Sequence, residues 1–145
     1  MNRLVDFLIN NHYKNITILA RVYSAYYRFR ILHTPMEKLQ KKIGIMGEEA
    51  SQEVTEEQAK IIRVISLKVN GICSKTKWES KCFVRALTAQ KLLKSYKIPS
   101  TLYMGVRTED DTMKAHAWII SGGRVVTGAN GGEYRLYTVV SKFRA

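Results

Sequence analysis

A cysteine and a histidine are the residues of this sequence best placed to do chemistry together. Cys82 lies near the start of the helix-patterned segment SKCFVRALTAQKLLKSY, residues 80–96, and His116 lies in the alternating stretch KAHAWII. If Ser80 caps that helix, Cys82 falls in the first turn, where unpaired backbone N–H groups and the positive end of the helix dipole stabilise a thiolate. A histidine on a later strand can serve as its base, which is the pattern of a thiol enzyme.

Both residues also have a structural explanation, which the sequence leaves open. On a helix, Cys82 shares a face with Ala86, Ala89, Leu93 and Tyr96. The other face carries Lys81, Arg85, Thr88, Lys91 and Ser95. Free cysteine is among the most buried residue types, so the thiol can be a packing residue. On a strand, His116 shares a face with Trp118 and Ile120, where a histidine is often structural.

Helices are predicted upstream of the cysteine. Apolar residues recur at helical spacing over residues 16–31, and a run of aromatic side chains from Tyr23 to Phe29 can serve either core packing or partner docking. The sequence TPME at 34–37 predicts a second helix, with a hydroxyl cap, a proline at the first helical position and a carboxylate three residues after the cap. Gly44 or Gly47 is expected to end it.

The period of the apolar residues changes after Pro99. Before it, Thr55 and Gln58 match a capping box and predict a third helix, which Asn70 and Gly71 are expected to end. After it, apolar and polar residues alternate, which predicts strands. The expected strands are residues 101–106, 115–121, 125–128 and 134–140. Helices first and strands last predict an α+β fold with an antiparallel sheet.

Length and composition indicate one folded unit. With 145 residues, 46% of them apolar, we expect an N-terminal helical extension at residues 1–54 and a single compact core at residues 55–145. The net charge of +12 favours anionic partners: nucleic acid, lipid or an acidic peptide. Residues 75–97 carry seven basic side chains, Lys75, Lys77, Lys81, Arg85, Lys91, Lys94 and Lys97, against one acidic residue, Glu79. These basic side chains can simply cover the solvent-exposed face of a helix. Alternatively, they can stabilise a thiolate at Cys82 and attract a substrate.

The N-terminus has no signal-peptide pattern, and arginines interrupt the most apolar stretch, residues 16–33. We therefore expect a cytoplasmic protein without a transmembrane segment. The two cysteines, Cys73 and Cys82, are nine residues apart with no histidine beside either, which fits no zinc or redox signature. No metal and no cofactor is expected, and the thiols should be reduced.

The string WESKCFVRALTAQKLLKSYKIPSTLYMGV, residues 78–106, followed by KAHAW and a glycine-rich return, resembles the C-terminal core of a peptidase family. These are the transglutaminase-like, papain-related cysteine peptidases that process lasso-peptide precursors. The shared features are a cysteine followed by R-A-L, an L-L-K-x-x-x-I-P helix exit, a G-V strand end and an A-H-A-W strand. The likeness covers about residues 70–140 and implies a catalytic-cysteine helix packed on an antiparallel sheet.

The resemblance implies that Cys82 is the nucleophile and His116 the general base and later acid. The family usually has an acidic residue about a dozen positions after the histidine, but residues 117–132 contain none. Asn130 is the nearest candidate for a third member, because a carboxamide can orient an imidazole through a hydrogen bond without a charge. The aspartates at 110–111 are alternatives in the preceding turn.

By the same resemblance, this bacterial family removes the leader peptide from a lasso-peptide precursor. The helices before the core suit its short, split form, in which a separate small leader-binding protein recognises the precursor. An ATP-dependent cyclase then closes the macrolactam ring. Two other classes remain: a catalytically inactive transglutaminase-like module that only binds peptides, and a basic nucleic-acid-binding domain. The second lacks a recognisable reading motif, so nucleic acid is not an expected partner.

Overall fold

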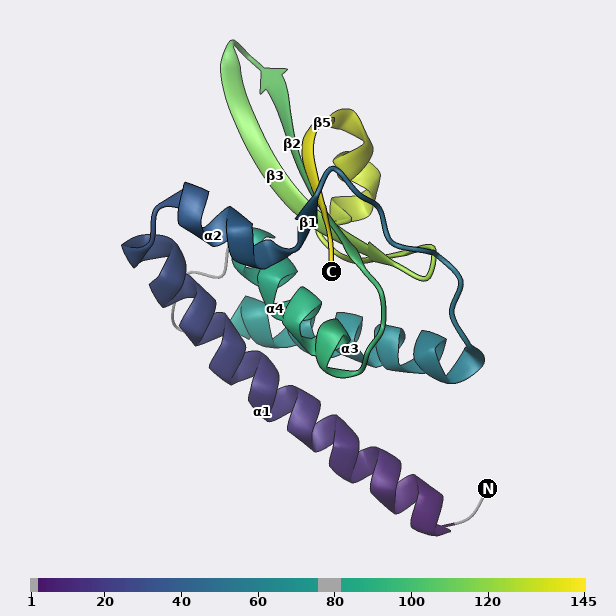
Figure 1. Cartoon of the computed structure of the whole chain (residues 1–145). Coiled ribbons are helices and arrows are strands. Elements are labelled where there is room, and N and C mark those ends of the chain that lie inside the picture. Colours follow the sequence, from purple (N-terminus) through teal and green to yellow (C-terminus); the bar gives the residue numbers. More distant parts are fainter. Residues whose placement is uncertain (1–2, 76–81) are drawn as a thin grey trace.

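Helices come first along the chain and most strands come last, as Figure 1 shows for the computed structural model, which describes residues 3–75 and 82–145. The helices are α1 (Arg3–His33), α2 (Met36–Ile43), α3 (Glu56–Lys75) and α4 (Cys82–Ser95). The strands are β1 (Ile45–Met46), β2 (Thr101–Glu109), β3 (Thr112–Ser121), β4 (Arg124–Thr127) and β5 (Thr138–Arg144), with a 3₁₀ helix, η1 (Asn130–Leu136), before β5.

The five strands form one antiparallel sheet in the order β1-β5-β2-β3-β4. The hairpin of β2 and β3 is its centre, and these strands pair over their whole length. By contrast, β4 pairs with β3 only at Ile119–Ser121, so this ladder does not extend to His116. The predicted α+β fold with an antiparallel sheet is confirmed.

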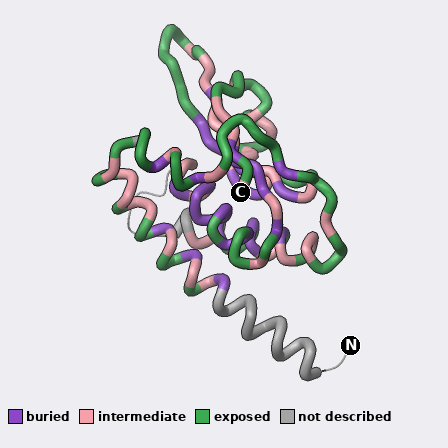
Figure 2. Tube along the Cα trace, viewed as in Figure 1, coloured by how far each residue is buried: buried purple, intermediate pink, exposed green. Residues whose placement is uncertain are grey.

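One hydrophobic core lies between the helices and the sheet, with α4 at its centre. The helix α4 contacts α1, α3 and β3, and Figure 2 shows the buried segments gathered where these elements meet. The largest fully buried apolar side chains include Phe143, Ile16, Ile62, Ile65, Leu92, Leu93, Leu102 and Ile119. Ile16 of α1 is therefore part of the same core as the strands, while the division at residue 54 stays a prediction.

Two predicted helix boundaries are wrong. The helix α2 begins one residue later than expected: Pro35 is the N-cap, and its carbonyl accepts hydrogen bonds from the backbone N–H groups of Lys38 and Leu39. Its end at Gly44 is as predicted. The helix α3 continues past residues 70–71 to Lys75. The amide of Asn70 donates to the Val126 carbonyl, so this side chain binds the sheet instead of ending the helix.

Two further expectations differ because tertiary packing outweighs local pattern. Thr88, placed on the polar face of α4, is fully buried, and its hydroxyl donates to the Val84 carbonyl at 2.7 Å, which satisfies it inside the core. The expected strand at residues 134–140 begins only at Thr138, because η1 occupies residues 130–136. The predicted cap of α4, Ser80, lies outside the described residues.

The capping box of α3 gives a stability prediction. The backbone N–H of Gln58 donates to the Thr55 hydroxyl at 3.1 Å, and the Thr55 backbone N–H donates to the Gln58 side-chain oxygen at 2.9 Å. Thr55→Ala should lower the free energy of unfolding by about 1 kcal/mol, because one helix-end N–H loses its acceptor. Thr55→Ser keeps the hydroxyl and is the control. Urea unfolding measures both; equal losses would contradict the capping role.

Candidate active site

Cys82 is the first residue of α4 and is partly buried. This position follows from the sequence, since the apolar residues that hold α4 in the core begin directly after it: Val84, Ala86 and Leu87 are all buried. The first backbone N–H groups of a helix have no intrahelical acceptor, so the start of α4 favours a negative charge on a sulfur or on a bound oxyanion. The predicted location of the thiol in the first helical turn is confirmed.

His116 lies on β3 with only 7% of its surface exposed. Its Nε2 atom is 2.6 Å from the main-chain carbonyl oxygen of Gly128. A carbonyl oxygen only accepts hydrogen bonds, so Nε2 carries the proton in this contact. In the neutral ring the lone pair is then on Nδ1, which is the nitrogen left to act as a base.

Gly128 is the residue that permits this contact. It follows β4 directly, has a φ of +84°, and lies against the backbone of β3. A Cβ atom here would come within 2.6 Å of the Ala117 carbonyl oxygen and 2.8 Å of the Trp118 Cβ. Only glycine therefore brings a carbonyl to the imidazole along this path without displacing β3.

The segment that carries Gly128 is fixed by α3. The Ser66 hydroxyl donates to the Val126 carbonyl at 2.6 Å, and the Asn70 amide donates to the same oxygen at 3.0 Å. Val126 is itself buried in the core. Two side chains of one helix thus hold β4 two residues before the glycine, which sets the position of its carbonyl.

Aromatic rings enclose the imidazole on the other side. The His116 ring is 5.7 Å from the Trp118 ring and 5.1 Å from the Tyr137 ring, measured between centroids. Gly105, opposite His116 on β2, makes room for this cluster, because a Cβ there would meet Trp118 and Tyr137 at 2.9 Å. Contact with two aromatic rings restricts rotation of the imidazole. The predicted common face of His116 and Trp118 is confirmed.

Cys82, His116 and Asn130 line one cavity of about 530 Å³. Its other lining residues are Ser66, Asn70, Arg85, Val125, Val126, Thr127, Gly128 and Ala129. The structure therefore brings all three predicted catalytic residues to the same space. The aspartates at 110–111 lie in the exposed turn between β2 and β3 and are not among the lining residues.

Sequence reasoning missed Gly128, Tyr137 and the pair Ser66 and Asn70. The signal for Gly128 was present in the spacing, because it lies twelve residues after His116, where an acidic side chain was sought. Every residue has a main-chain carbonyl, so a search for Asp, Glu or Asn side chains cannot find an acceptor of this kind. Within the described residues, no group of three His, Cys, Asp or Glu side chains could hold a metal ion.

Comparison with protein families gives a match to the transglutaminase-like superfamily over residues 24–142. The chain belongs to this superfamily. Its members have the fold of transglutaminases and papain-like cysteine peptidases, which agrees with a cysteine at a helix start and a histidine on a strand. Curated proteins and solved structures provide no match. Among the described helices, none has the length and apolar character needed to cross a membrane.

For this transglutaminase-like protein, Gly128→Ala tests the contact at Nε2. The added Cβ should displace the Gly128 carbonyl, so that the Nε2–H group loses this acceptor and binds water instead. Gly131→Ala is the matched control and should leave the contact intact. Gly131 also has a positive φ, +66°, but a Cβ there meets nothing within 4 Å. Nitrogen-15 NMR of the neutral His116 ring should show the Nε2–H tautomer in the wild type and the control. A mixture of tautomers is expected in Gly128→Ala, and an unchanged His116 spectrum would contradict the positioning role.

Proposed function

We propose that this protein is a cysteine peptidase in which Cys82 is the nucleophile and His116 the general base. The observation that carries the proposal is that the thiol at the start of α4 and the imidazole held by Gly128 line one cavity. Membership of the transglutaminase-like superfamily supports the same chemistry. The tautomer with Nδ1 unprotonated supports it too, because a base needs a free lone pair.

In the proposed reaction, the Cys82 sulfur attacks the scissile carbonyl carbon while its proton passes to His116. The backbone N–H of Cys82 is proposed as one donor to the oxyanion that forms. His116 then returns the proton to the leaving amine, and the acyl group stays on sulfur as a thioester. A water molecule, deprotonated by the same imidazole, attacks the thioester and restores the free thiol.

Asn130 remains our proposal for a side chain that assists the imidazole. It lines the cavity two residues after Gly128 and is exposed, with a φ of +47°. Since the Gly128 carbonyl already contacts Nε2, the Asn130 amide is proposed to bind at the cavity mouth, near the ring or the substrate. Its removal should therefore have a smaller effect than a change at Cys82 or His116.

The proposed substrate is a lasso-peptide precursor, from which the protein removes the leader peptide. This rests on the likeness of residues 78–106 and of the A-H-A-W strand to that peptidase family. The proposed partners follow from it: a small leader-binding protein that captures the precursor, and an ATP-dependent cyclase that closes the macrolactam ring afterwards. We place the reaction in the cytoplasm, where thiols stay reduced.

An inactive peptide-binding module is the second candidate. The observation that favours it is that a neutral main-chain carbonyl contacts His116 at Nε2, where a carboxylate is usual in the family. Such a module would bind the precursor without cutting it. Cleavage assays on the purified chain separate the two functions.

Cys82→Ala and His116→Ala should each lower the rate of precursor cleavage by on the order of 10³-fold or more, because each removes a participant in bond making. The control Cys73→Ala removes the other thiol of the chain and should retain activity. Mass spectrometry of the wild type with a slowly hydrolysed ester substrate should detect an acyl group on Cys82. Turnover that survives in Cys82→Ala would refute the assignment of the nucleophile.

The role of the leader-binding protein is tested by omitting it. If that protein supplies substrate capture, the purified chain alone should cleave precursor at a low concentration much more slowly than the mixture, with the difference mainly in KM. A short substrate that contains only the residues around the cut should be cleaved at the same rate with and without the leader-binding protein. Full cleavage of the precursor by the chain alone would contradict the dependence.

A further inference from the structure

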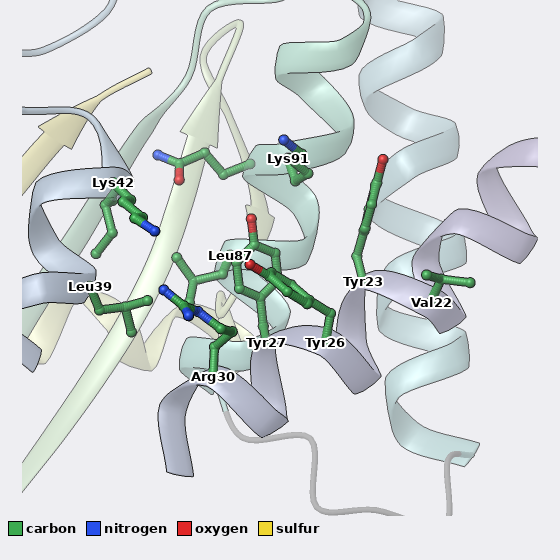
Figure 3. Close-up of a pocket in the computed structure, with 11 residues that line it drawn as sticks. Val22, Tyr23, Tyr26, Tyr27, Arg30, Leu39, Lys42, Leu87 and Lys91 are labelled. Carbon is green, nitrogen blue, oxygen red and sulfur yellow. The ribbon is translucent and has the colours of Figure 1, made fainter. Parts of the chain in front are cut away.

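A second cavity lies between α1, α2 and α4, away from Cys82 and His116. Its volume is about 390 Å³. The apolar side chains of Leu39, Ile43 and Leu87 form part of its wall. Figure 3 shows the rings of Tyr26 and Tyr27 and the charged ends of Arg30 and Lys42 converging on the same region of this cavity. We call it the tyrosine cavity.

The tyrosine cavity carries positive charge and no negative charge. Arg30, Lys42 and Lys91 line it, and no Asp or Glu is among its lining residues. An adjoining cavity of about 400 Å³ shares Arg30 and Lys42 and adds His33, Lys38 and Lys41, again without a carboxylate. In the part of the chain that the structure describes, no ion pair joins any of these lysines or Arg30 to an acidic side chain. The two cavities together are therefore suited to an anion.

A buried amide in the same cavity lacks a hydrogen-bond acceptor. Gln90 of α4 lines the tyrosine cavity, has only 6% of its surface exposed, and its Nε2 atom has no partner among the described residues. A buried donor without an acceptor is unfavourable, and native structures rarely keep one without a reason. An oxygen atom of a ligand in the cavity would supply the missing acceptor.

The tyrosine hydroxyls are further donors to such a ligand. Burial, with smaller contributions from Tyr26 and Tyr23, raises the pKa of Tyr27 to about 12. The phenol therefore stays protonated and can donate to an anion at any physiological pH. Protonated phenols, cations and an amide N–H, set over apolar walls, match a carboxylate carried on an apolar stem.

The surface beside the cavity favours a peptide over a free anion. On α1 the residues Ile18, Val22, Tyr26, Phe29 and Leu32 follow each other at spacings of four, four, three and three, and each is at least half exposed. This helical spacing aligns them on one face, and two of them, Val22 and Tyr26, also line the tyrosine cavity. An apolar stripe that adjoins a basic cavity fits a segment with alternating apolar and acidic side chains.

We propose that the tyrosine cavity and the α1 stripe bind an acidic, partly apolar peptide segment of a partner protein, with a carboxylate seated among Arg30, Lys42 and Gln90. This site is separate from the candidate active site and does not depend on the proposed peptidase activity. Its ligand is recognised by charge and by apolar contact, whatever reaction occurs at Cys82.

The binding test compares two fluorescein-labelled, amidated hexapeptides, Gly-Glu-Leu-Glu-Phe-Glu and its isostere Gly-Gln-Leu-Gln-Phe-Gln, by fluorescence polarisation on the full chain at low salt. The acidic peptide should bind about tenfold tighter or more, and Arg30→Gln/Lys42→Gln should remove the difference. The matched control, Lys97→Gln/Arg124→Gln, changes the net charge equally at exposed positions outside both cavities and should retain it. Equal loss in both double variants would overturn the proposal, because it would indicate general attraction by net charge.

Gln90→Leu separates binding from stability. If the acceptor for Gln90 Nε2 is a ligand, replacing the amide by an apolar side chain of similar size should leave the Tm unchanged or raise it. The same change should weaken binding of the acidic peptide. A lower Tm with unchanged peptide affinity would show a structural role and overturn the assignment. Cys82→Ala should bind the peptide as the wild type does, so failure of the peptidase proposal leaves this test intact.

Two competitors test the class of partner. Vesicles of phosphatidylcholine with phosphatidylserine, and an oligothymidine strand, should bind with equal affinity to the Arg30→Gln/Lys42→Gln and the Lys97→Gln/Arg124→Gln variants. If either one binds tightly, loses affinity only in the Arg30 and Lys42 variant, and displaces the acidic peptide, the cavity serves a membrane or a nucleic acid and the proposal fails.

Discussion

The close approach of Gly128 to β3 is the contact on which the candidate active site depends. Because this residue has no Cβ, its chain lies against Ala117 and Trp118, and its carbonyl oxygen comes to 2.6 Å from His116 Nε2. That one hydrogen bond fixes both the orientation of the ring and the nitrogen that keeps its lone pair. Its geometry depends in turn on α3, which holds the Val126 carbonyl through Ser66 and Asn70. The His116 imidazole is thus positioned by the backbone that follows β4 and by α3, a helix that carries neither Cys82 nor His116.

A carbonyl differs from a carboxylate in what it does for a protonated imidazole. Both orient the ring, but only a carboxylate offsets the charge of an imidazolium with a full negative charge. In the reaction that we propose for this chain, the negative charge nearest to the imidazolium would therefore be on the substrate or on the Cys82 sulfur. Cys82 at the start of α4 has helix N–H groups and the positive end of the helix dipole beside it, which favour the sulfur anion. The arrangement therefore relies more on the helix and less on a third side chain than one with Asp in the family's usual position.

The sequence predicted those features that local pattern determines. Thr55 and Gln58 form the expected capping box, and alternation located β2 and β3. Residue type singled out Cys82 and His116, which line one cavity, while their catalytic role stays a prediction. Failures occurred where a distant contact outweighs pattern: the Asn70 side chain reaches the sheet, so it does not end α3. The Gly128 carbonyl was out of reach for a different reason. A main-chain oxygen carries no signature, and its direction depends on how two strands and a helix pack.

Two buried polar residues of α4, Thr88 and Gln90, show why packing alone does not account for this helix. The Thr88 hydroxyl donates a hydrogen bond to the Val84 carbonyl one turn earlier, so its partner lies within the same helix. Gln90 lines the tyrosine cavity, where its Nε2 atom has no partner among the described residues and the neighbouring Arg and Lys side chains can only donate. A buried donor without an acceptor lowers the stability of the fold unless solvent or a ligand supplies one. The side of α4 that faces α1 and α2 therefore offers donors and positive charge to an anion, which is the basis of the site that we propose there.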